Sequence, residues 1–257
     1  MVGQKPSKTK EMKVRTKTFW LPKRGNTAEE YEDAAWPLDP VDCETDAFKC
    51  AVADGATEAS FSRRWAELLV KGFEDETEIA QLAENWSAEI KTMDLPWYAQ
   101  EKAESGAFAT FSGLSLKCNG TASGSYTAKL LGDSCIFHMR GEKLIEAMPL
   151  TNYESFNNSP ELLCSNFSTH GNVDAMFTSK SGTWESGDRF LLVTDAIAAW
   201  TFKRQEEHGD GFKKLLALDT QESLNDLCLT AREEHDEHGR PNMRNDDVTL
   251  LIVEVLS

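Results

Sequence analysis

FKCAVADGAT, residues 48–57, is the stretch around which the chain is organised. An apolar run of β-favouring residues ends in a carboxylate and a glycine, which predicts a buried strand with Asp54 at its open end. A glycine after the acid permits a tight turn and lets its own carbonyl approach a cation. The same pattern also ends ordinary hairpins, so its meaning depends on the rest of the chain.

Two more predicted strands carry acids at their ends. Residues 190–196 form an apolar run that leads into Asp195, and residues 245–253 place two acids before another apolar run. Residues 30–34, EYEDA, supply a fourth acidic segment. Mg²⁺ and Mn²⁺ prefer carboxylate and water oxygens as ligands. Acids at the ends of three buried strands therefore predict convergence on one hard-metal site.

Four blocks of the sequence resemble the metal-dependent Ser/Thr phosphatases of the protein phosphatase 2C type, in a divergent bacterial form. In chain order, the blocks are Glu32-Asp33-Ala34, Val52-Ala53-Asp54-Gly55, Gly132-Asp133-Ser134, and the pair Thr194-Asp195 with Asp246-Asp247-Val248-Thr249. Together the blocks span nearly the whole chain. Each is unspecific alone, but four in the family's order are difficult to obtain by chance.

The resemblance implies an α+β fold, a four-layer α/β/β/α sandwich with two central, mostly antiparallel sheets. The order of predicted elements fits two packed sheets with helices on both outer faces, and leaves a single mixed sheet as the alternative. The implied reaction is hydrolysis of phosphoserine or phosphothreonine in phosphoproteins by a water activated at two Mn²⁺ or Mg²⁺ ions, without a covalent intermediate. A third ion is not supported, because residues 149–153, where many members supply a further aspartate, contain no acid.

The resemblance also assigns the metal ligands residue by residue. Asp54 is expected to bridge both ions. The carbonyl of Gly55 and the side chain of Glu32 are expected to serve one ion, and Asp195 and Asp246 the other. A phosphoprotein substrate and a cognate Ser/Thr kinase system are the implied partners.

Supporting roles are implied for other residues of the four blocks. Asp33 is expected to hold water at the ions, and Asp133 to give structural support behind the site. Ser134 is not expected to be a nucleophile, because the nucleophile-elbow pattern and an ordered histidine partner are missing. Asp247 stands where relatives commonly have asparagine, so the choice between Asp246 and Asp247 as the ligand rests on alignment alone.

Several positions depart from the family pattern. The family's spacing places its phosphate-binding arginine at Ala28, so Lys23 or Arg24 on the preceding loop is expected to take that role, Arg24 being better suited to bidentate binding. A solvated basic loop is the alternative. Ala56 occupies the place of a histidine proposed as the leaving-group acid, and Ala196 replaces the usual glycine.

These departures keep a second class of function open, a phosphatase-like binding or regulatory module with weak or no catalysis. Retention of the acids argues against it, since a pure scaffold has little use for crowded carboxylates. A metal-dependent nuclease needs similar acids. The 43 acidic against 27 basic residues give a net charge of −16, which argues against a nucleic-acid partner because phosphate backbones require a basic surface.

Length and composition fit a single catalytic domain over residues 14–257 that follows a disordered basic tail over residues 1–13. The six cysteines are scattered without a CxxC pair, which is typical of reduced, buried thiols. No apolar run approaches the roughly 20 residues needed to span a bilayer. We therefore expect a cytoplasmic protein with no membrane or nucleic-acid partner.

Periodicity gives the expected elements. Strands are predicted over residues 14–21, 107–118, 125–131, 135–140, 143–148, 173–179, 188–194 and 248–256. The four strands between residues 107 and 148 read as a meander in one antiparallel sheet. Helices are predicted over residues 58–73, 77–93, 97–105, 196–208, 211–218 and 221–234, with a short one starting at residues 159–163. The charged loop over residues 235–244 is expected to be mobile.

Overall fold

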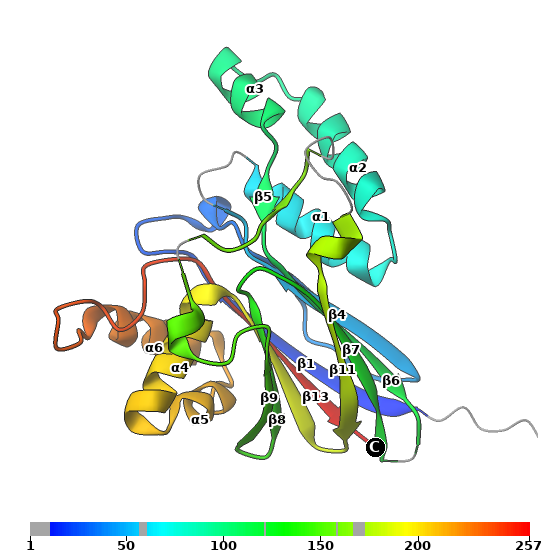
Figure 1. Ribbon diagram of the computed structural model, residues 1–257, viewed down its shortest axis with the longest axis vertical. Helices are drawn as coiled ribbons and strands as arrows, with labels where there is room; N and C mark the ends of the chain where they lie inside the picture. Colours follow the sequence, from blue (N-terminus) through cyan, green and yellow to red (C-terminus); the bar gives the residue numbers. More distant parts are fainter. Residues whose placement is uncertain (1–10, 57–60, 121, 158, 167–172) are drawn as a thin grey trace, which may run out of the picture.

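Two sheets lie face to face in the centre of the molecule (Figure 1). The structure is a computed structural model that describes residues 11–56, 61–120, 122–157, 159–166 and 173–257. The six-stranded sheet has the order β3-β1-β13-β12-β8-β9, and all its pairings are antiparallel. Its strands are β1 (Met12–Leu21), β3 (Asp42–Thr45), β8 (Cys135–Arg140), β9 (Lys143–Met148), β12 (Asp188–Val193) and β13 (Val248–Leu256).

The five-stranded sheet has the order β11-β7-β6-β4-β2 and is also antiparallel. Its strands are β2 (Ala34–Trp36), β4 (Ala47–Ala53), β6 (Phe111–Cys118), β7 (Ser123–Leu131) and β11 (Thr178–Glu185). A two-residue ladder joins β5 (Phe108–Ala109) to β10 (Leu163–Cys164). This ladder continues the line of β4, because Gly55 bridges to Ala109.

The core between the sheets comes from alternate residues of strands in both. Leu114 of β6, Trp184 of β11, Phe190 of β12 and Leu251 of β13 are fully buried in one cluster. Successive side chains of a strand point to opposite faces, so the other set meets the helices. Full burial of one large apolar side chain contributes about 1.5–3 kcal/mol, and this cluster therefore holds the sheets together.

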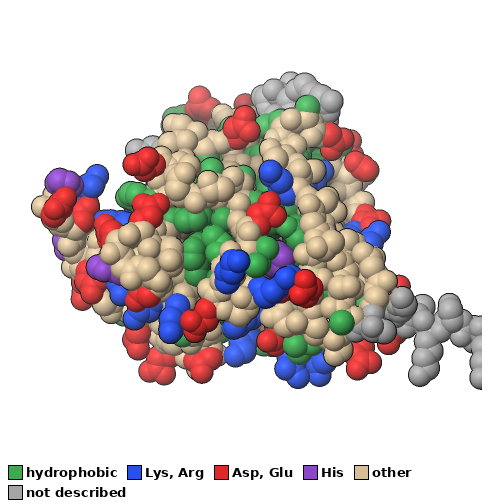
Figure 2. All heavy atoms as spheres, turned by 60° about the horizontal axis from the view of Figure 1, so that its bottom comes forward, with side chains coloured by type: hydrophobic (Ala, Val, Ile, Leu, Met, Phe, Trp, Pro, Cys, Tyr) green, Lys and Arg blue, Asp and Glu red, His purple; other side chains and the backbone are tan. Residues whose placement is uncertain are grey.

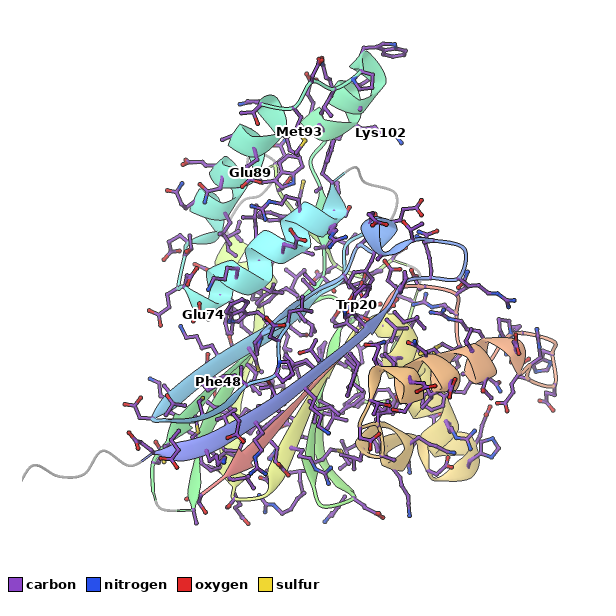
Figure 3. All side chains as sticks on the ribbon, turned by 180° about the vertical axis from the view of Figure 1, so that it is seen from behind. Trp20, Phe48, Glu74, Glu89, Met93 and Lys102 are labelled. Atoms are coloured by element: carbon purple, nitrogen blue, oxygen red, sulfur yellow. The ribbon has the colours of Figure 1, made fainter. Side chains whose placement is uncertain are left out.

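Helices cover both outer faces (Figure 1). The five-stranded sheet packs against α1 (Ser62–Glu74) and α2 (Ile79–Lys91), and α3 (Trp97–Glu104) adds Ala103 to that core. Figure 3, where Glu89 of α2 is labelled, shows α2 and α3 extending beyond the sheets. The six-stranded sheet packs against α4 (Asp195–His208), α5 (Gly211–Leu216) and α6 (Gln221–Glu233). The predicted four-layer α/β/β/α sandwich is confirmed, and the single mixed sheet is excluded.

The predicted meander does not form one sheet. β6 and β7 pair in the five-stranded sheet, whereas β8 and β9 pair in the six-stranded one. The chain crosses between the sheets at residues 132–134, where Gly132 has a φ of +88° that favours glycine. Period-two alternation is identical in both sheets, so the sequence could not show this crossing. The crossing matters for the site because it brings Asp133 to the end of the sandwich.

Three other local predictions are corrected. No helix starts at residues 159–163; Leu163–Cys164 forms β10, and a 3₁₀ turn lies earlier at Tyr153–Ser155, capped by the side chain of Asn152. Val173–Met176 is a 3₁₀ turn, so the strand begins only at Thr178. Neither β2 nor β3 was predicted. Both are short, and β3 is polar, so neither carries a strong strand signal.

The first strand and the first helix also differ from their predictions in where they start. β1 begins at Met12, which is fully buried, so the last residues of the predicted tail belong to the sheet. The rest of that tail, residues 1–10, lies outside the described residues. The described part of the first helix starts at Ser62, and residues 58–60 of the predicted helix lie outside the described residues. No helix in the described ranges is long and apolar enough to cross a membrane.

Candidate metal centre

Asp54 directly follows β4, and the main chain around it is fixed. Its carbonyl accepts a hydrogen bond from the Thr110 amide at 2.9 Å, and its own amide donates to the Thr110 hydroxyl at 3.3 Å. Two residues on, the Ala56 amide donates to the Phe108 carbonyl at 2.9 Å. The backbone donors and acceptors of this turn are therefore used by the sheet, and the Asp54 carboxylate is held at the strand end.

The strand-end acids converge on Asp54. Burial raises the pKa of Asp54 well above its ordinary value, and the charges of Asp33, Asp195, Asp246 and Asp133 raise it further. Carboxylates influence one another in this way only when they lie close together. The structure thus gathers the acids that end β4, begin α4 and precede β13, together with Asp33 before β2.

Asp33 is almost completely buried, and hydroxyl groups surround it. The Thr249 hydroxyl donates to Asp33 Oδ2 at 2.7 Å and is itself hydrogen-bonded to the Tyr31 hydroxyl. The ring of Tyr31 packs on Trp20, labelled in Figure 3, with 4.9 Å between ring centroids. Burial raises the pKa of Asp33, while hydrogen bonds from Thr249 and Thr194 oppose that rise. This network fixes Asp33 but leaves Oδ1 without a hydrogen-bond partner.

The two acids that precede β13 have different hydrogen-bond partners, and Asp247 binds the backbone of a distant loop. Its two carboxylate oxygens accept the amides of Lys23 and Glu32, each at 2.7 Å. The Asp246 carboxylate accepts the neighbouring amide of Asp247 at 3.0 Å, and its charge reaches Asp54. Asp247 thus ties the start of β13 to the N-terminal loop.

The two basic residues of that loop point to different surroundings. Lys23 Nζ lies 3.6 Å from Glu32 Oε2, and both residues line a cavity of about 510 Å³. The Arg24 side chain is 66% exposed and lies 3.6 Å from Glu233 at the end of α6. The Glu32 carbonyl packs against Gly55, where a Cβ atom would lie only 2.6 Å from it. The structure therefore brings Lys23, Glu32 and Gly55 together and leaves Arg24 apart.

The crossing between β7 and β8 places Asp133 among the acids. Its Oδ1 is buried without a hydrogen-bond partner, and burial raises its pKa to about 7, with a further contribution from the charge of Asp195. The charge of Asp246 also raises this pKa, and the supporting role expected for Asp133 stays a prediction. Ser134 is fully buried and hydrogen-bonded to Thr110 at 2.6 Å, so it has no access to a substrate, as expected.

Sequence reasoning missed Arg244. Its guanidinium forms an ion pair with Asp195, and its charge also acts on Asp133. The available signal was its position two residues before Asp246, inside a loop that was expected to be mobile. Thr194 and Thr249 were also missed as Asp33 partners, although both stand in the matched blocks beside the acids.

Some carboxylate oxygens of these acids have no hydrogen-bond partner and could bind a metal ion. One oxygen each of Asp33, Asp133 and Asp195 is buried without a hydrogen-bond partner, and a buried polar atom normally has one. Among the described residues, however, no group of three His, Cys, Asp or Glu side chains forms a ready ligand set. Mg²⁺ usually keeps several waters and takes only one or two carboxylates. The unpartnered carboxylate oxygens suit hard divalent cations that complete their coordination with water.

The similarity of this chain to known proteins lies in its structure. No family model matches the sequence, and no curated protein matches it. The structure of the Mycobacterium tuberculosis serine/threonine phosphatase PstP/Ppp matches with a TM-score of 0.59 and 14% identity, over 95% of this chain and 100% of that chain. The catalytic domain of the phosphatase PstP in complex with two manganese ions gives 0.57 and 15%, over 96% and 100%.

A third similar structure is itself described as a PP2C phosphatase domain. The PP2C phosphatase domain with a regulatory fragment of SpoIIE from Bacillus subtilis has a TM-score of 0.53 and 16% identity, over 96% of this chain and 64% of that chain. The chain has the protein phosphatase 2C-like fold. The resemblance read from the four blocks is therefore confirmed as a divergent form of this fold.

Within the protein phosphatase 2C-like fold, the acids lie at the ends of elements from both halves of the sandwich. β4 delivers Asp54 from the five-stranded sheet, whereas Asp195 and Asp246 adjoin β12 and β13 of the six-stranded sheet. Each sheet alone supplies only part of the acid cluster. The chemistry of the site therefore depends on how the two sheets pack.

Proposed function

We propose that this chain is a metal-dependent protein Ser/Thr phosphatase that hydrolyses phosphoserine or phosphothreonine in phosphoproteins. The observation that carries the proposal is the convergence of Asp33, Asp54, Asp195 and Asp246 in a protein phosphatase 2C-like fold. Burial raises the pKa values of three of these acids, Asp33, Asp54 and Asp195, and acids with perturbed pKa values gathered in one place are typical of a functional site. A phosphoprotein, and the kinase that phosphorylates it, are the proposed partners.

The residues that would hold two Mn²⁺ or Mg²⁺ ions are Asp54 as the shared ligand, Glu32 and the Gly55 carbonyl on one side, and Asp195 and Asp246 on the other. Asp246 is favoured over Asp247 because both oxygens of Asp247 already accept backbone amides. Bound divalent cations would supply a water of lowered pKa and would neutralise phosphoryl oxygens.

Asp33 and Lys23 have roles that follow from their own contacts. Asp33 Oδ2 is occupied by the Thr249 hydroxyl, so Oδ1 is the atom available to accept a hydrogen bond from water and orient it. Lys23 carries a positive charge beside Glu32 at the cavity wall. Of the two candidate phosphate ligands on this loop, we therefore favour Lys23 over Arg24.

The excess of acidic residues argues against the nuclease alternative. Figure 2 shows acidic side chains spread over the visible face, with lysines and arginines scattered among them instead of forming one basic area. With a net charge of −16, a polyanionic nucleic acid would be repelled. A phosphorylated side chain presents only a few charges and is compatible with such a surface.

One assay tests the proposed function. We expect the purified chain to hydrolyse p-nitrophenyl phosphate and a phosphothreonine peptide with Mn²⁺ or Mg²⁺, and to lose this activity in EDTA, because the proposed nucleophile is a water whose pKa the bound cations would lower. Binding of the phosphopeptide without hydrolysis under any metal condition would instead support the binding-module alternative. Hydrolysis unaffected by EDTA would contradict the metal-dependent mechanism.

The leaving group gives a second prediction. Ala56 has no proton to donate, and general acid catalysis is typically worth about 10²–10⁴-fold. Rates for a series of aryl phosphates should therefore fall steeply as the pKa of the leaving phenol rises. Ala56→His is the matched variant and should flatten this dependence by accelerating the poor leaving groups. A flat profile in the unmodified chain, with chemistry rate-limiting, would contradict the argument.

A further inference from the structure

Arg244 is held among the acids by the fold of its loop. On one side, Met243 is buried and its amide donates to the Ala231 carbonyl at 3.0 Å. On the other side, the carbonyl of Asp246 accepts from the Arg232 guanidinium at 2.6 Å. Both anchors belong to α6, so the backbone is fixed immediately before and after Arg244. The fold therefore fixes the backbone that carries Arg244 close to Asp195.

The remainder of this loop is also anchored. Asp236 accepts the amides of His238 and Arg240 at 3.0 and 2.9 Å, and Lys203 of α4 lies 3.3 Å from Asp236. Lys203 also donates to Asn242 at 3.1 Å. The loop that was expected to be mobile is thus fastened to α4 as well as to α6.

The guanidinium acts as the counter-ion for one side of the acid cluster. Burial lowers the pKa of Arg244, but the charges of Asp195, Asp246 and Asp133 more than offset this and raise it. Conversely, burial raises the pKa of Asp195, and the charge of Arg244 opposes that rise. Other cations nearby have their own acidic partners, since Lys23 pairs with Glu32 and Arg24, as described, with Glu233.

The Arg244 guanidinium and a divalent cation would both bind the Asp195 carboxylate. Asp195 is a proposed metal ligand, yet its Oδ2 carries the Arg244 ion pair. Its other oxygen, Oδ1, is buried without a hydrogen-bond partner and is open to a divalent cation. A guanidinium on Oδ2 of the same carboxylate would lie close to that cation and weaken its binding, because like charges repel. The Arg244 side chain is 44% exposed, so it can swing away while its backbone stays fixed. A released guanidinium presents a planar fork of donors that matches phosphate oxygens as well as it matches a carboxylate.

We propose that Arg244 exchanges partners during the cycle: it neutralises Asp195 in the metal-free site, yields that carboxylate to a divalent cation, and then binds the substrate's phosphoryl group. This inference rests on the proposed function. Arg244 would then take the role of the phosphate-binding arginine that is missing at Ala28, although Arg244 lies near the other end of the sequence. The exchange also makes the affinity for metal depend on a residue that is not itself a ligand.

The first test is calorimetric titration of the metal-free chain with Mn²⁺. An opposite charge nearby changes the proton affinity of a carboxylate by about 10- to 1,000-fold, so Arg244→Gln should bind Mn²⁺ about tenfold more tightly. Arg240→Gln is the matched control. It removes the same charge from the same loop, but Arg240 pairs with Asp236, so its Mn²⁺ affinity should match that of the unmodified chain.

The second test measures inorganic phosphate as a competitive inhibitor of the Mn²⁺-saturated enzyme, with p-nitrophenyl phosphate as substrate. Arg244→Gln should raise the inhibition constant about tenfold or more, and Arg244→Lys, which keeps the charge but loses the fork, should also raise it. Unchanged or weaker Mn²⁺ binding in Arg244→Gln, or unchanged phosphate inhibition, would overturn the exchange. Failure of the unmodified chain to bind Mn²⁺ at all would instead overturn the proposed function.

Discussion

Asp54→Asn should abolish Mn²⁺-dependent phosphatase activity, lowering kcat/KM by at least about 10³-fold, which corresponds to about 4 kcal/mol of transition-state stabilisation. Asp54 lies where the charges of Asp33, Asp195, Asp246 and Asp133 all act on it. It is the residue proposed to contact both cations, and an amide lacks the negative charge for this. Steady-state hydrolysis at saturating Mn²⁺ measures the loss.

The same variant should remain folded. Burial and neighbouring negative charges raise the pKa of Asp54, so ionised Asp54 destabilises the metal-free fold, and a neutral amide of the same shape relieves that repulsion. Circular dichroism should show an unchanged spectrum and a melting temperature no lower than that of the metal-free parent. Asp46→Asn is the control, because Asp46 is exposed at the opposite end of β4. Near-normal turnover of Asp54→Asn would show that the site is assigned incorrectly.

Mn²⁺ should raise the melting temperature of the chain by about 5–10 °C for each ion bound, relative to a sample in EDTA. At a free concentration 100 times the dissociation constant, one site that exists only in the folded state contributes about 2.7 kcal/mol. For a chain of this size, each kcal/mol shifts the melting temperature by about 2–4 °C. Differential scanning calorimetry with and without Mn²⁺ measures the shift.

The size of this effect follows from the crowding of the acids. At an effective dielectric constant near 20, one pair of like charges 4 Å apart costs about 4 kcal/mol, and cations remove such repulsion as well as adding coordination. Asp54→Asn should lose most of the Mn²⁺-induced rise, whereas Asp46→Asn should keep it. Residues 149–153 lack an acid, so calorimetric titration should find at most two tight sites. An unchanged melting temperature, or three tight sites, would contradict the proposed arrangement.

The sequence predicted the elements that are long and apolar. Residues 50–53 of β4, 190–193 of β12 and 250–253 of β13 are buried on both faces and read as continuous apolar runs, which is a strong signal. The short strands β2 and β3 lack this signal. The distribution of the strands between residues 107 and 148 over two sheets was also hidden, because alternation says which residues face a core but not which sheet they join.

The acids of the site could be predicted, but most of their partners could not. Asp54 and Asp195 each end an apolar run, which is a local pattern. The amides that bind Asp247 and the Thr249 hydroxyl that binds Asp33 lie 215 or more residues from their partners. Arg244 likewise meets Asp195 across 49 residues. Such pairs exist only once the sheets have packed, so no local periodicity reveals them.

The hydrogen bonds of Asp247 have a consequence for biosynthesis. On the ribosome, the loop that contains Lys23 and Glu32 emerges long before Asp247, and β1 must wait for β13, with which it pairs from Lys13 to Leu21. Closing so long a segment is slow compared with local contacts. The acid cluster is thus among the last features to assemble. A nascent chain that stops short of Asp246 and β13 carries Asp54 but not the complete acid cluster, so the proposed activity would require that synthesis has passed that strand.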